Sequence, residues 1–205
     1  MSGPEPALLD RIRDKLELLR RVAADGELAV VVGDPTPLEP VPDLPGVAEV
    51  YSLFGRLEGD NFRFAPPAEI VTPAAWAART VDESDPMGSP LAVGHELHSI
   101  PPGLRDDIPA GAPIYLDPED LDVYWMEPDD YVFQYEHPDE DVAFTVLAPD
   151  VATFFDEHVL GPRYPELVAT VLGPGVAERR LRTGRHTGEY ADNWRRLLIA
   201  AGLSS

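Results

Sequence analysis

The sequence predicts an α+β fold: a mainly antiparallel sheet of about five to six strands, with helices packed on one face and at both ends. An amphipathic segment near the start has helical spacing. A middle region, residues 90–147, alternates short apolar runs with Pro, Gly and Asp turns. Two further helical patterns follow it. This order of helices, strands and helices is typical of α+β proteins, and a length of 205 residues favours one domain.

The N-terminal third is predicted to contain short elements around a proline-rich connector. Residues 5–24 form a helix whose apolar side chains recur every three or four positions: Leu8, Leu9, Ile12, Leu16, Leu19 and Val22. Residues 28–32 (LAVVV) predict a strand, because the run is rich in β-branched side chains. Residues 33–46 hold five prolines, which predicts an extended connector. Residues 46–54 and 72–80 predict short helices, and a strand lies around residues 62–64.

The middle region predicts an antiparallel meander of strands separated by turns. Its expected strands are residues 91–97, 113–117, 121–127, 131–136 and 142–147. In residues 121–127, one face of the strand carries Leu121, Val123 and Trp125. The other face carries Asp122, Tyr124 and Met126. One face of the sheet therefore belongs to the core, and the other exposes aromatic and acidic side chains.

The C-terminal third predicts helices on either side of a basic loop. Asp150 is the expected N-cap of a helix over residues 148–160, and a second helix over residues 162–172 ends at Gly173. The basic residues 176–188 predict a mobile loop, and residues 189–203 a helix with Trp194, Leu197 and Leu198 on its apolar side. We therefore expect a single domain over residues 1–173, with residues 174–205 as an appended loop and helix.

The charge of the chain is concentrated in one block. Of the net charge of −21, residues 1–105 contribute −8, residues 106–162 contribute −16 and residues 163–205 contribute +3. The block has no Lys or Arg, yet it holds 9 of the 17 aromatic residues, too many for a disordered acidic tail. The carboxylates are therefore expected to decorate a folded sheet. Such a surface attracts basic partners and argues against nucleic acid or membrane as a partner.

Several motifs that suggest chemistry fail on geometry. His95 and His98 stand three residues apart on an expected strand and so point to opposite faces, unlike the paired histidines of a zinc helix. Counted from Asp117, an EF-hand loop needs an acid where Leu121 stands and glycine where Asp122 stands. With no cysteine, thiol catalysis is excluded, and the composition fits a cytoplasmic protein. We expect no catalytic residues, no metal site and no cofactor, although weak divalent binding by the carboxylates stays open.

The order of elements resembles the SUKH superfamily, which includes fungal cell-wall-assembly regulators and bacterial immunity proteins that neutralise toxins, often nucleases. The resemblance covers residues 44–160. It rests on Leu44-Pro45, GVAEVYSLFGRLEG, the strand NFRF, the runs LAVG, APIYLD and DVYWME, and the paired phenylalanines of VATFFDEHVL. Residues 28–32 and everything after Gly173 have no counterpart, and the resemblance implies no catalytic set.

The resemblance and the charge together predict a non-enzymatic, cytoplasmic protein-binding domain that neutralises a basic, nuclease-type toxin through an acidic sheet face. The expected partner-binding residues are Asp122, Tyr124, Asp129, Asp130, Glu136, Asp139, Glu140 and Asp141. Three alternatives stay open. The chain could be a housekeeping regulatory or scaffold domain with an endogenous basic partner, a metal-dependent enzyme using the clustered carboxylates, or a domain whose charge serves solubility alone.

Overall fold

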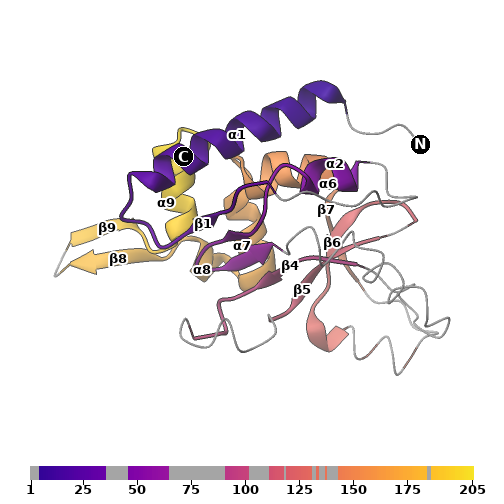
Figure 1. The fold of residues 1–205 in the computed structure, drawn as a ribbon. Coiled ribbons are helices and arrows are strands. Elements are labelled where there is room, and N and C mark those ends of the chain that lie inside the picture. Colours follow the sequence, from indigo (N-terminus) through magenta and orange to yellow (C-terminus); the bar gives the residue numbers. More distant parts are fainter. Residues whose placement is uncertain are drawn as a thin grey trace.

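The computed structural model describes residues 5–35, 46–64, 91–101, 111–117, 119–130, 133, 137, 143–183 and 186–205. Within these residues the fold is α+β, as predicted, with a seven-stranded antiparallel sheet and a separate two-stranded hairpin (Figure 1). The strand order in the larger sheet follows the chain, β1 to β7. The strand number slightly exceeds the predicted five to six.

The larger sheet is a meander in which each strand pairs with the next along the chain. Its strands are β1 (Val31–Val32), β2 (Leu57–Glu58), β3 (Phe62–Phe64), β4 (Leu91–Glu96), β5 (Pro113–Leu116), β6 (Val123–Trp125) and β7 (Thr145–Ala148). The meander predicted for the middle region is confirmed for β4 to β7. Residues 28–32 form a strand only at Val31–Val32.

Helices lie at both ends of the chain and cover one face of the sheet (Figure 1). They are α1 (Pro6–Ala24), α2 (Val47–Tyr51), α6 (Val151–Thr153), the π-helix η2 (Phe154–Val159), α7 (Tyr164–Leu172), α8 (Pro174–Ala177) and α9 (Asn193–Ala200). The predicted cap at Asp150 is confirmed, because its side chain accepts a hydrogen bond from the backbone N–H of Thr153 at 2.7 Å. The predicted stop at Gly173 is also confirmed: its φ is 89°, a conformation that favours glycine.

The hydrophobic core lies between the sheet and these helices. At its centre the rings of Tyr51, Phe54 and Phe155 pack at centroid distances of 5.0–5.4 Å, in tilted or edge-on arrangements. Asp156 on η2 connects this helix to α1, because its buried carboxylate pairs with Lys15 at 2.8 Å and with Arg11 at 2.9 Å. This member of the acidic block therefore has a structural role rather than contributing to an open surface.

The strand predicted over residues 131–136 is wrong at Phe133, which is helical. Residues 128–130 are helical as well, and the backbone N–H of His137 donates to the carbonyl of Phe133, the spacing of a helix. The physical reason lies in the residues just before the aromatic ones. Pro128 suits the first turn of a helix, and the carboxylates of Asp129 and Asp130 are favoured near a helix N-terminus.

The mobile loop predicted over residues 176–188 is also wrong. Residues 174–177 form α8, and β8 (Arg180–Thr183) pairs antiparallel with β9 (His186–Tyr190). The guanidinium carbon of Arg180 lies 3.8 Å from the centroid of the Tyr190 ring, and that of Arg195 on α9 lies 3.4 Å from it. These cation–π contacts help to order a basic segment whose glycines suggested flexibility.

The residues predicted as a C-terminal appendage pack into the main core. Trp194, Leu197 and Leu198 of α9 are buried, as the amphipathic pattern predicted, and they belong to the same cluster as Leu16 and Leu19 of α1. In Figure 1, α9 lies beside the C-terminal part of α1. The chain after Gly173 is thus continuous with the core of the preceding residues.

The helix predicted over residues 72–80 lies outside the described residues. In the described part of the chain, no helix combines the length and the apolar character needed to cross a membrane.

Candidate functional site

A row of aromatic side chains crosses the sheet face opposite the core. Tyr115 on β5 pairs in register with Tyr124 on β6, and their rings stack at a centroid distance of 5.5 Å. The ring of Phe144 lies 5.3 Å from that of Tyr124, and Val146 on β7 is the register partner of Tyr124. Their neighbours in β5 and β6 point the other way, into the core, because successive residues of a strand alternate.

This row presents an apolar centre to solvent. Phe144 is 54% exposed and Val146 is 48% exposed, which is unusual for large apolar side chains. Tyr124 is only 4% exposed, since it lies between Tyr115 and Phe144. Tyr124 therefore supports the exposed side chains in the free protein, whereas Phe144 and Val146 are available for contact.

Carboxylates border the aromatic row at the β5–β6 turn. The backbone N–H of Asp117 donates to the carbonyl of Asp122 at 2.9 Å, which places these two acidic residues opposite each other. Each stands two positions from its tyrosine, on the same face. We call Tyr115, Asp117, Asp120, Asp122, Tyr124, Phe144 and Val146 the aromatic–acidic surface.

The electrostatics of this surface are unfavourable to its own carboxylates. Partial burial, followed by the charges of Asp120, Asp117 and Asp150, raises the pKa of Asp122. None of Asp117, Asp120 and Asp122 forms an ion pair with another described residue. Like charges placed opposite each other on neighbouring strands destabilise a sheet. The fold thus holds negative charge at the turn at a cost in stability.

We expect Asp122→Asn to raise the free energy of unfolding at pH 7 by about 0.5 kcal/mol, because it removes one of two opposed charges. Because the pKa of Asp122 is higher in the folded than in the unfolded protein, the folded wild type binds more protons. The free energy of unfolding of the wild type therefore falls as pH rises through those two pKa values. Urea unfolding at pH 7 and pH 4 measures both effects. The gain should shrink at the lower pH; a loss of stability at pH 7 would contradict the electrostatic account.

The structure brings together only part of the predicted partner-binding set. Asp122 and Tyr124 belong to the aromatic–acidic surface. Asp129 is exposed and Asp130 is half-buried, both on the helical turn after β6. The remaining predicted residues lie outside the described part of the chain: Glu136, Asp139, Glu140 and Asp141.

Several members of the surface were missed from the sequence. The signal for Tyr115 and Asp117 was available, since the runs PIYLD and LDVYW repeat the same two-residue spacing between an aromatic and an acidic residue. Phe144 carried no such signal, because its run, VAFTVL, reads as a buried strand.

The two histidines of the HELH run do not share a strand, because β4 ends at Glu96, before His98. His95 lies across from Arg63 in the sheet, and burial together with the Arg63 charge lowers its pKa. His98 lies beyond the end of β4, with its Nδ1 atom 3.2 Å from the side-chain oxygen of Asn61. Among the described residues no group of three or more His, Cys, Asp or Glu side chains has an arrangement that could hold a metal ion.

Comparison with known proteins returned no matching family model, no matching curated protein and no matching solved structure. The fold and the surfaces described above are therefore the basis for inferring function. Of these, the aromatic–acidic surface combines exposed apolar side chains with carboxylates that pair with no described residue, and protein-binding sites have an apolar centre with a polar rim.

Proposed function

We propose that this chain is a non-enzymatic, cytoplasmic protein-binding domain that recognises a basic partner through the aromatic–acidic surface. The observation that carries the proposal is the exposure of Phe144 and Val146 next to carboxylates that form no ion pair with any residue in the described part of the chain. In protein interfaces a buried apolar anchor supplies much of the affinity, and a charged rim sets the encounter rate and the selectivity.

The partner would meet these features in sequence. The carboxylates of Asp117, Asp120 and Asp122 attract a positively charged surface over a distance of about 8 Å at physiological salt. Phe144 and Val146 then bury against the partner, with Tyr124 and Tyr115 as a rigid support beneath them. Acidic side chains that repel one another are suited to this role, because a positively charged partner reduces that repulsion on binding.

We propose further that the chain is related to the SUKH superfamily and acts as an immunity protein against a basic, nuclease-type toxin. Support comes from the order of elements: β4, β5 and β6 form consecutive antiparallel strands, and the paired Phe154 and Phe155 of the following helical segment are buried. An acidic surface of this kind would cover the positive, substrate-binding groove of a nuclease.

The test uses the protein encoded beside this gene, purified as an inactive variant, because an immunity protein is encoded next to its toxin. Binding kinetics are measured at low and at physiological salt. Asp117→Asn/Asp120→Asn/Asp122→Asn should lower the association rate constant about tenfold at low salt. Asparagine keeps the oxygen that accepts the turn's backbone hydrogen bonds. Phe144→Ala should mainly raise the dissociation rate, weakening binding by about 1–2 kcal/mol.

The matched control, Asp14→Asn/Glu17→Gln/Glu27→Gln, removes the same charge from exposed positions on and after α1. It should leave the association rate nearly unchanged. An equal loss in both triple variants would show that only net charge matters and would refute this surface as the site. If the neighbouring protein does not bind but an endogenous basic protein does, with the same dependence on Phe144, the immunity role fails and the scaffold role replaces it.

A further inference from the structure

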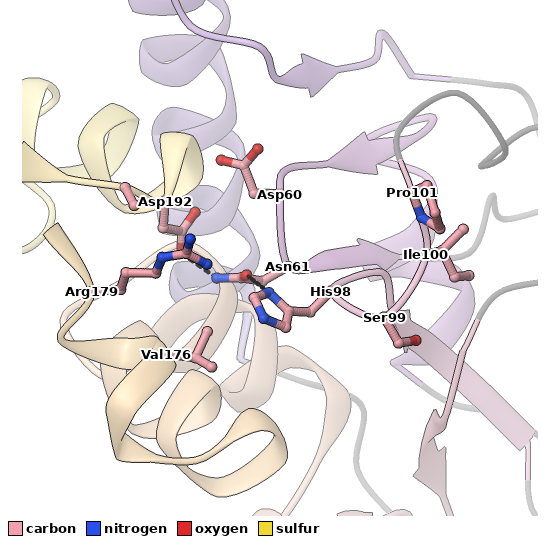
Figure 2. Close-up of a pocket in the computed structure, with 10 residues that line it drawn as sticks. Asp60, Asn61, His98, Ser99, Ile100, Pro101, Val176, Arg179 and Asp192 are labelled. Carbon is pink, nitrogen blue, oxygen red and sulfur yellow. Dashed lines mark hydrogen bonds between the residues drawn. The ribbon is translucent and has the colours of Figure 1, made fainter. Parts of the chain in front are cut away.

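A polar pocket of about 440 Å³ lies away from the aromatic–acidic surface, where four separate segments meet. The β2–β3 turn contributes Asp60 and Asn61, and the turn after β4 contributes His98. Arg179 comes from the segment after α8, and Asp192 directly precedes α9. Figure 2 shows the side chains of Arg179 and His98 reaching the pocket from different sides of Asn61. This volume suits a small metabolite.

The floor of the pocket is a buried hydrogen-bond network centred on the Asp192 carboxylate. One oxygen accepts from the Asn61 amide and from the Tyr164 hydroxyl, each at 2.8 Å. The other caps α9 by accepting from the backbone N–H of Trp194 at 2.9 Å and that of Arg195 at 3.4 Å. Burial raises the pKa of Asp192, whereas the hydrogen bonds from Tyr164 and the backbone N–H groups lower it and favour the ionised, accepting form. Asp192 is therefore saturated by the protein and serves to position Asn61.

This network fixes the proton on His98. Because the nitrogen of the Asn61 amide donates to Asp192, its oxygen is the atom that faces His98, at 3.2 Å from Nδ1. A carbonyl oxygen only accepts, so Nδ1 carries the hydrogen in the neutral ring. Nε2 of His98 is then left with its lone pair. His98 is exposed and lines the pocket, so this acceptor is available to a ligand.

Arg179 contributes hydrogen-bond donors and a positive charge to the pocket. Its side chain is exposed and lines the pocket, and no described residue forms a hydrogen bond or ion pair with its guanidinium. A guanidinium without a protein partner can bind a carboxylate or a phosphate through paired N–H groups. The nearby carboxylates of Asp60 and Asp192 would repel a ligand that carries a further negative charge besides the group bound by Arg179. They favour a ligand that also carries a positive or donating group.

We propose that this pocket binds a small zwitterion of the amino-acid type. The ligand's carboxylate pairs with the guanidinium of Arg179, and its ammonium group donates to Nε2 of His98. Asp60 adds negative charge to the pocket lining, and its Oδ2 accepts from the backbone and side-chain N–H groups of Asn193. This binding site is separate from the protein-binding role of the aromatic–acidic surface.

Nitrogen NMR of the His98 ring tests the proposal directly. In the free protein, the long-range ¹H–¹⁵N spectrum of the neutral imidazole should show protonated Nδ1 and unprotonated Nε2. Free amino acids are then titrated individually, with acetate as the anion alone and ethylamine as the cation alone. We expect at least one amino acid to shift the His98 nitrogens in a saturable way, and neither of the two half-ligands to do so.

Two variants identify the role of the guanidinium. Arg179→Gln should weaken the amino acid's affinity about tenfold or more, because a charge-assisted pair is lost. Arg182→Gln, which removes another exposed arginine from β8, should leave affinity unchanged. The proposal is overturned if no amino acid saturates His98 below about 10 mM, that is, if the binding free energy is weaker than about −2.7 kcal/mol. Equal binding of acetate, or full affinity in Arg179→Gln, would overturn it as well.

Discussion

Replacing Asp192 with alanine is expected to lower the free energy of unfolding by about 3 kcal/mol or more. The substitution removes the N-cap of α9, which is worth about 1 kcal/mol. It also leaves the Asn61 amide and the Tyr164 hydroxyl, both nearly inaccessible to solvent, without their acceptor. A buried donor without a partner costs roughly 1–3 kcal/mol. Urea unfolding followed by circular dichroism measures the change.

Two further variants define this result. Glu27→Ala, at an exposed acidic position after α1, should change stability by less than about 0.5 kcal/mol. Asp192→Asn should lose less than Asp192→Ala, because the amide oxygen can still cap the helix. If Asp192→Ala cost no more than Glu27→Ala, the network would not be formed in solution. The tautomer assigned to His98 would then lose its basis.

The second large effect concerns the C-terminal helix. Trp194→Ala is expected to cost about 3–5 kcal/mol, the range for truncating a buried aromatic side chain. Trp194 is 2% exposed, and its indole N–H donates to the carbonyl of Val159 at 2.9 Å. A Cβ added at Gly59 would lie 2.8 Å from the Cβ of Trp194, so the turn after β2 packs closely against this residue. Thermal and urea unfolding measure the loss.

Removal of residues 174–205 extends this test to the domain organisation. We expect the shortened chain to lose cooperative unfolding, because α9 supplies three side chains to the core that α1 also forms. Ile199→Ala, at a position of α9 that is 38% exposed, is the matched control and should cost about 1 kcal/mol or less. A shortened chain that unfolds cooperatively at unchanged stability would restore the view of these residues as an appendage.

The strands and most of the helices were predictable because their patterns are local. Alternation in DVYW indicated which side chains of that strand face the core, and the strand register of the structure places Tyr115 opposite Tyr124. The failures have local causes too. Around Phe133 the period-two aromatic pattern competed with helix-initiating signals at Pro128 and Asp129, and the helix prevailed.

The sequence by itself determined the α+β class, the meander and the concentration of negative charge in one block, because each depends on neighbours along the chain. Only the tertiary structure decided that Phe144 is exposed while Tyr124 is covered, and that Asp192 meets Asn61 across 131 positions of sequence. Such contacts form when packing brings distant segments together, and the composition of either segment alone does not encode the partner. The pocket containing His98 and Arg179 arises in the same way, from four segments that meet only in the folded chain.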